Sequence, residues 1–117
     1  MKERFAELAD EVEAALVIND DLAERTISAL GEYSEGLQTD KADLDSTDKV
    51  LALIHAVRPG WDVTIKGNVR MPNGHWRCTL RKSAGRDNDE YLGVARGPTL
   101  PHSLLASLLK VLSFESR

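Results

Sequence analysis

The chain of 117 residues has a single cysteine, four prolines and only six aromatic side chains. One cysteine cannot form an intramolecular disulfide, so the chain is not a small disulfide-stapled scaffold. No apolar run approaches the roughly 20 residues that span a bilayer, and the N-terminal segment has no apolar signal core. We therefore expect a cytoplasmic protein of one domain with a single modest core.

Charge is unevenly distributed along the chain, although the formal net charge is only −4. Residues 1–50 hold 14 acidic and 5 basic side chains, whereas residues 51–117 hold 5 acidic and 10 basic side chains. Such a split is typical either of an acidic arm beside a basic, partner-binding body, or of an ordinary solvated surface with local clustering.

The clearest pattern is a strict alternation of apolar and polar residues in the middle of the chain. Apolar or small residues occupy the odd positions of 61–69 and the even positions of 76–80. A period of two indicates two strands that each bury one face. A four-residue hairpin loop at 71–74 explains why the apolar residues move from odd to even positions. It places Ile65 opposite Leu80, so the apolar residues of both strands lie on one face.

Two amphipathic helical segments precede this hairpin. Residues 2–17 place apolar side chains three and four positions apart, and a second helix follows the predicted N-cap Asn19 and stops at Gly31. The pattern fits one bent helix or a helical hairpin equally well. We predict a helical extension over 1–35, a linker over 36–45 and a domain over 46–117.

The domain over 46–117 has the predicted order helix, strand, strand, strand, helix. Ser46 or Thr47 caps the first helix, residues 90–96 form the third strand, and Thr99 caps a broadly apolar last helix. This order predicts an α+β fold, an αβββα core with a three-stranded antiparallel sheet and two helices on one face. The other face is then open, or the N-terminal helical extension covers it.

The end of the domain resembles that of a known family. The stretch Tyr91–Pro101, running into Leu104-Leu105-Ala106, is similar to the close of small prophage-type proteins with an "ABA sandwich" domain, where a strand, a Thr-Pro-like turn and an Ala/Leu-rich helix follow one another. The resemblance covers residues 46–113 and implies a phage-derived or bacterial protein of unassigned biochemistry.

The order of elements also looks like that of a double-stranded-RNA-binding domain, and Pro72-Asn73-Gly74-His75-Trp76 echoes a loop of that family. Members of that family open their last helix with clustered lysines that contact phosphates. Here the corresponding helix has no lysine before Lys110.

The polar side of the hairpin gathers cationic side chains. The predicted pairing sets Lys66 opposite Thr79 and brings Lys66, Arg70, Arg77 and Arg81 onto one face. Like charges gathered so closely need a counter-charge. The acidic N-terminal helices, an acidic partner protein or a nucleic-acid backbone could supply it.

Signatures of catalysis and of cofactor binding are absent from the sequence. The three histidines, His55, His75 and His102, are not at metal-ligand spacing, and surface or capping roles are expected for them. The parity of the strands predicts that Cys78 is a core thiol and that Trp61 and Trp76 anchor the core. No phosphate-binding loop, serine elbow or metalloprotease pair occurs.

We therefore expect a non-catalytic protein–protein interaction or adaptor domain with no cofactor, no bound metal and no membrane association. It would bind a partner protein or a second copy of itself through its basic face or an apolar helical stripe. A nucleic-acid-binding module that uses the basic face is one alternative. A small-ligand or enzyme site near the acidic loop at 83–90 is another.

Overall fold

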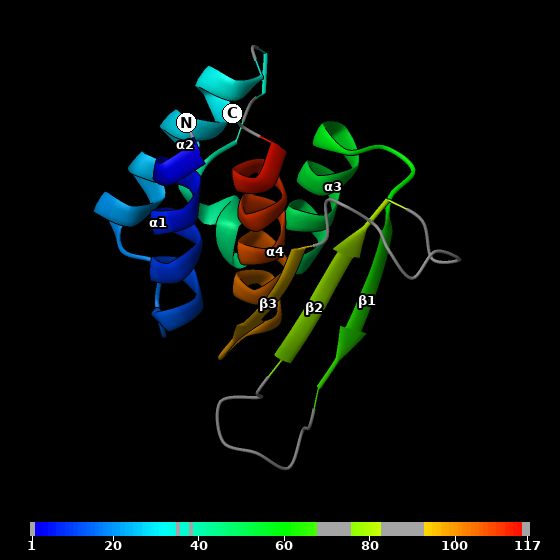
Figure 1. Cartoon of the computed structure of the whole chain (residues 1–117). Helices are drawn as coiled ribbons and strands as arrows, with labels where there is room; N and C mark the ends of the chain where they lie inside the picture. Colours follow the sequence, from blue (N-terminus) through cyan, green and yellow to red (C-terminus); the bar gives the residue numbers. More distant parts are fainter. Residues whose placement is uncertain (1, 35, 38, 68–75, 83–92, 116–117) are drawn as a thin grey trace.

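The computed structural model describes residues 2–34, 36–37, 39–67, 76–82 and 93–115 (Figure 1). Its elements follow one another as α1 (Lys2–Ala14), α2 (Asp20–Tyr33), the 3-10 helix η1 (Lys41–Asp45), α3 (Thr47–Val57), β1 (Asp62–Lys66), β2 (Trp76–Arg81), β3 (Gly93–Gly97) and α4 (Leu100–Glu115). The predicted α+β class and the order helix, strand, strand, strand, helix are confirmed.

The three strands form one antiparallel sheet in the order β1-β2-β3. Helix α4 packs on β2 and β3, and both α1 and α3 pack on α4 (Figure 1). The helices therefore form one layer on one side of the sheet. The N-terminal helices do not cover the opposite face, because α1 lies against α4 and the margin of β3.

Helix α4 is the centre of the molecule because it is buried on almost every side. Its fully buried residues include Leu104, Leu105, Leu108, Leu109 and Leu112. A helix that is apolar all round must be enclosed by other elements, and here the sheet, α1 and α3 enclose it. The broad apolar face predicted for the last helix is confirmed.

Small residues let α4 approach β3 closely. A Cβ atom added to Gly93 would lie 2.2 Å from the backbone oxygen of Ser107, so only glycine fits there. Beside it, the hydroxyl of Ser103 donates to the carbonyl oxygen of Ala95 at 3.1 Å. These contacts join the backbones of the helix and the strand almost directly.

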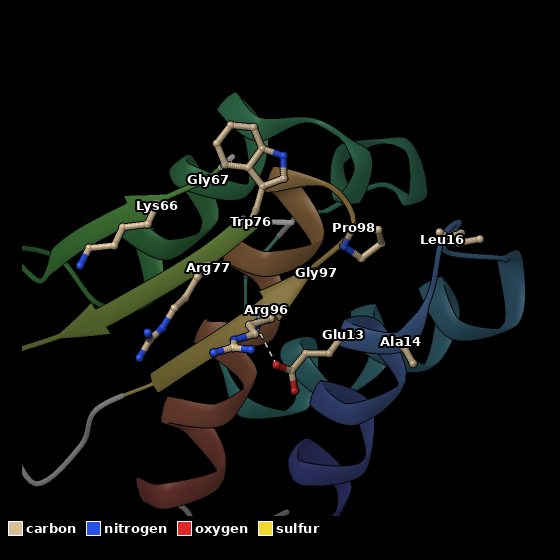
Figure 2. Close-up of a pocket in the computed structure, with 10 residues that line it drawn as sticks. All are labelled: Glu13, Ala14, Leu16, Lys66, Gly67, Trp76, Arg77, Arg96, Gly97 and Pro98. Carbon is tan, nitrogen blue, oxygen red and sulfur yellow. Dashed lines mark hydrogen bonds between the residues drawn. The ribbon is translucent and has the colours of Figure 1, made fainter. Parts of the chain in front are cut away.

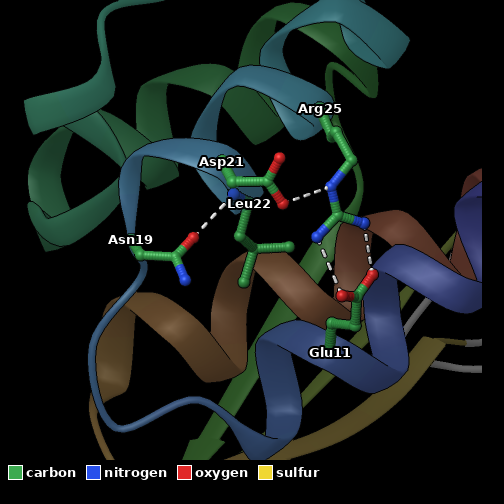
Figure 3. Close-up of polar contacts among 5 residues, drawn as sticks. All are labelled: Glu11, Asn19, Asp21, Leu22 and Arg25. Carbon is green, nitrogen blue, oxygen red and sulfur yellow. Dashed lines mark hydrogen bonds and ion pairs between the residues drawn. The ribbon is translucent and has the colours of Figure 1, made fainter.

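The N-terminal segment is a helical hairpin (Figure 3). The predicted cap is confirmed, since the side chain of Asn19 accepts from the backbone N–H of Leu22 at 2.8 Å. Arg25 of α2 then donates to both carboxylate oxygens of Glu11 of α1, at 2.6 and 2.8 Å. The predicted end at Gly31 is wrong, because α2 continues to Tyr33. The ring of Tyr33 packs edge-on against that of Phe5, which extends the contact between the two helices.

The segment expected to be a linker contains η1, whose Leu44 is fully buried. The next residue, Asp45, accepts a hydrogen bond from His102 with an Nε2–Oδ1 distance of 2.9 Å. His102 Nδ1 lies 3.1 Å from the carbonyl oxygen of Ala15. The expected surface or capping role of His102 is wrong, because only 2% of the residue is exposed. Through these two ring contacts, the His102 side chain ties α4 to η1 and to the residue that follows α1.

The register of the hairpin differs from the sequence-based pairing by two residues. The observed pairs are Asp62 with Arg81, Val63 with Leu80, Thr64 with Thr79, Ile65 with Cys78 and Lys66 with Arg77. The predicted pairs of Ile65 with Leu80 and Lys66 with Thr79 are therefore wrong. A shift of two residues leaves every side chain on its predicted face, so alternation alone cannot fix this register. The predicted turn at 71–74 lies outside the described residues.

Candidate functional site

Three cationic side chains form a row across the open face of the sheet. Lys66 of β1 lies directly opposite Arg77 of β2, and Arg77 lies directly opposite Arg96 of β3. We call these three residues the cation row. All three are exposed, and within the described part of the chain none of their side chains forms a hydrogen bond or an ion pair.

A pocket of about 560 Å³ adjoins the cation row (Figure 2). Its lining residues are Glu13, Ala14, Leu16, Lys66, Gly67, Trp76, Arg77, Arg96, Gly97 and Pro98. The lining thus combines cationic side chains with the apolar groups of Leu16, Trp76 and Pro98. Such a lining suits a ligand that carries both negative charge and an apolar group.

The tryptophan of this pocket sits at the end of β2. Figure 2 shows Trp76 and Arg77 projecting to opposite sides of the sheet, as the alternation predicts. A Cβ atom added to Gly67 would lie 2.3 Å from the Trp76 ring, so the ring lies directly over this glycine. Trp76 is half-buried rather than fully enclosed. The expected core anchor therefore also forms part of the surface of the pocket.

Glu13 is the acidic residue in the lining of this pocket, and its carboxylate already has partners. Oε2 accepts from the backbone N–H of Arg96 at 2.8 Å, and Oε1 lies 2.9 Å from Lys110 Nζ. Lys110 neutralises its charge, so Glu13 leaves the three side chains of the cation row without a dedicated counter-ion.

The acidic N-terminal helices do not neutralise the cation row. In the described part of the chain, four of their carboxylates pair within the helical layer: Glu32 with Arg4, Glu11 and Asp21 with Arg25, and Glu24 with Lys41. Glu13 of α1 reaches the margin of the sheet, but it contacts only the backbone N–H of Arg96 and not a side chain of the cation row. Within the described residues, the N-terminal helices therefore do not supply the expected counter-charge. The charge asymmetry of the sequence becomes an acidic helical layer and a separate basic sheet face.

Two of the four predicted patch residues belong to the cation row. Lys66 and Arg77 lie side by side, whereas Arg81 is half-buried at the far end of β2, opposite Asp62. Arg70 lies outside the described residues. Arg96 is absent from the predicted patch, although the small residues at 93, 95 and 97 that alternate with it could have indicated that it faces outward.

Other reactive side chains offer no second site in the described regions. Cys78 is fully buried, as predicted, and burial raises the pKa of its thiol, which disfavours the nucleophilic thiolate. His55 is exposed on α3. Among the described residues, no three His, Cys, Asp or Glu side chains are grouped as metal ligands would be. The acidic loop at 83–90 lies outside these residues.

No helix in the described ranges has both the length and the apolarity needed to cross a membrane. No protein-family model, curated protein or solved structure matches this chain. Inference about function therefore depends on the geometry of the sheet face and its pocket.

Proposed function

We propose that this chain is a non-catalytic protein-interaction domain that binds an acidic segment of a partner protein on its open sheet face. The observation that supports this most strongly is the cation row. Like charges directly opposite one another in a sheet are destabilising. Carboxylates of a bound segment would remove this repulsion between Lys66, Arg77 and Arg96.

The pocket beside the cation row favours a segment with an apolar anchor. Leu16, Trp76 and Pro98 line it together with the cations, and a buried apolar or aromatic anchor commonly contributes most of the affinity at protein interfaces. We infer a short acidic stretch with one large apolar side chain that enters the pocket. Its neighbouring carboxylates would contact the cation row.

An acidic protein segment fits this surface better than a nucleic acid does. The chain as a whole is acidic, with a pI of about 5.3, and its helical layer would repel an extended polyanion. Proteins that bind single strands place several aromatic side chains along a cationic groove. Trp76 is the aromatic residue that lines this pocket, and its ring rests on Gly67.

A non-catalytic role agrees with the chemistry of the pocket. Glu13, its acidic group, is held by Lys110 and by the backbone of Arg96. The lining described here contains no serine, cysteine or histidine that could act as a nucleophile or proton carrier. The phage-derived origin implied by the sequence resemblance and a cytoplasmic location stay predictions.

A titration with synthetic peptides tests the proposal. The probe is a fluorescent peptide of glutamates and aspartates around a central leucine, and the comparison peptide replaces the acids with glutamine and asparagine. We expect the acidic peptide alone to bind, with an affinity that falls as salt is added. Arg77→Gln and Arg96→Gln should each weaken binding about fivefold, the equivalent of about 1 kcal/mol. Lys49→Gln removes the same charge from an exposed site on α3 and should leave affinity unchanged.

Two results would refute this function. Tighter binding of single-stranded or duplex nucleic acid than of the acidic peptide at the same salt concentration would make the cation row a phosphate-binding surface. Equal loss of affinity in Arg77→Gln and Lys49→Gln would show that the peptide responds only to overall charge.

A further inference from the structure

The two edges of the sheet differ in how their backbone groups are satisfied. At the β3 edge, Lys110 Nζ donates to the carbonyl oxygen of Val94 at 2.8 Å, and Glu13 accepts from the N–H of Arg96 at 2.8 Å. The same two charged side chains form an ion pair at 2.9 Å. Charged groups placed on an edge prevent another strand from pairing there. The β3 edge is therefore closed.

At the β1 edge, two residues direct their backbone N–H and C=O groups away from the sheet. In an antiparallel sheet, consecutive residues direct their N–H and C=O groups to opposite sides. Arg96 directs its N–H away from β2, so its partner Arg77 turns its backbone groups toward β1, where it pairs with Lys66. Lys66 therefore bonds inward, and the alternation makes Ile65 and Val63 direct their groups outward. Within the described part of the chain, no residue hydrogen-bonds to these outward groups.

The sequence of β1 is complementary to itself when it is reversed. The strand reads Asp62-Val63-Thr64-Ile65-Lys66. In an antiparallel pair of two copies centred on Thr64, Asp62 lies opposite Lys66 of the second copy. Val63 lies opposite Ile65 of the second copy, and Thr64 lies opposite itself. Opposite charges and apolar pairs each stabilise directly opposed strand positions.

We propose that two copies of this chain associate through their β1 strands in this register, joining two three-stranded sheets into one sheet of six strands. The direction of the backbone N–H and C=O groups along β1 supports the proposal independently of the side chains. Val63 of one copy and Ile65 of the other both direct N–H and C=O groups outward, so each such pair exchanges two hydrogen bonds. Thr64, which bonds inward, forms the non-hydrogen-bonded pair on the two-fold axis.

The dimer would place groups that are exposed in the single chain against one another. Ile65, 40% exposed, would pack beside Val63 of the second copy, and Lys66 would gain Asp62 of the second copy as an opposite charge. The two-fold axis is perpendicular to the sheet, because directly opposed residues share a face. Both cation rows therefore lie on the same side of the six-stranded sheet. The dimer does not depend on the proposed function, and together the two proposals give one dimer two binding surfaces on the same side.

Pairing of two five-residue strands buries little surface, so the association should be weak. Contacts below about 1,200 Å² of total buried area belong to weak or transient complexes. Sedimentation velocity at concentrations from micromolar to near-millimolar should therefore show a monomer converting into a dimer. A chain that stays monomeric over the whole range would overturn the proposal.

Oxidative cross-linking of variants that each carry one introduced cysteine tests the register. In a Thr64→Cys dimer the two introduced residues form a non-hydrogen-bonded pair, with Cα atoms about 4.5 Å apart, within the range of a disulfide. In a Lys66→Cys dimer the two introduced cysteines lie four strand positions apart, with Cα atoms about 14 Å from each other. This distance is too long for a disulfide. Both positions are exposed, and the native Cys78 is buried. Because Lys66→Cys also removes the charge pair with Asp62, a mixture of Asp62→Cys and Lys66→Cys separates the effect of distance from the loss of that pair.

We expect Thr64→Cys to form a covalent dimer at least tenfold faster than Lys66→Cys. A mixture of Asp62→Cys and Lys66→Cys should cross-link as a heterodimer. Equally fast cross-linking of Thr64→Cys and Lys66→Cys would indicate parallel strands or random collision, and would refute the register. Binding of an extended acidic peptide along β1 of a chain that stays monomeric would replace the second copy with a foreign strand and would also refute the dimer.

Discussion

Replacing Gly93 by alanine should destabilise the protein more than any other conservative change of a glycine at a described position. The added Cβ would lie 2.2 Å from the Ser107 oxygen and 2.8 Å from a methyl carbon of Val111. An ordinary contact between these atoms is about 3.5 Å, so β3 and α4 must separate by about 1 Å. Overpacking of this kind typically costs 1–3 kcal/mol. We expect about 3 kcal/mol here, because backbone atoms of both elements must move.

Urea denaturation followed by circular dichroism measures this loss, and Gly31→Ala provides a matched control. No atom lies within 4 Å of a Cβ added at Gly31, which is inside α2. Alanine there should stabilise the protein by about 0.5 kcal/mol, through helix propensity. A Gly93→Ala variant as stable as the wild type would show that α4 does not contact β3 as described.

Two further substitutions test contacts between the helices. His102→Ala should lower the free energy of unfolding by about 3 kcal/mol, because it removes a buried side chain that bonds to Asp45 and to the Ala15 carbonyl. Thermal denaturation measures this loss, and a change below about 1 kcal/mol would contradict the prediction. Glu11→Gln should cost only about 0.5 kcal/mol at neutral pH, since its ion pair with Arg25 is exposed. Hydrogen bonding to Arg25 lowers the pKa of Glu11, so this contribution is present above the usual carboxyl pKa of about 4.3 and is lost as the pH falls through the lowered value. The two curves of stability against pH should therefore meet in acid, and a difference that persists there would refute this origin.

Alternation of residue type predicts which face of each strand is buried, but not which residues pair. Cys78 and Leu80 are buried and Arg77 is exposed, as period two requires. The pairing of Ile65 with Cys78 rather than Leu80 depends on how the chain connects β1 to β2. A pairing shifted by two keeps the same faces, so the side-chain pattern cannot distinguish the two registers.

The part of the candidate site that the sequence does not predict comes from long-range packing. Glu13 lies 83 positions before Arg96, and the two meet only because α1 packs on α4 beside β3. The burial of His102 likewise depends on η1, a short helix within a polar segment without a helical period. Caps are local, which explains why Asn19 could be predicted from its neighbours alone.

The most direct test of the open cationic face is an NMR titration of the isotope-labelled chain with the acidic, leucine-containing peptide. We predict shifts of amide signals near the cation row, in residues 64–67, 76–79 and 94–97, and weaker shifts in Arg77→Gln. Shifts confined to α2 and α3, or none at peptide concentrations where a fluorescent probe reports binding, would contradict the assignment of this face as the binding surface.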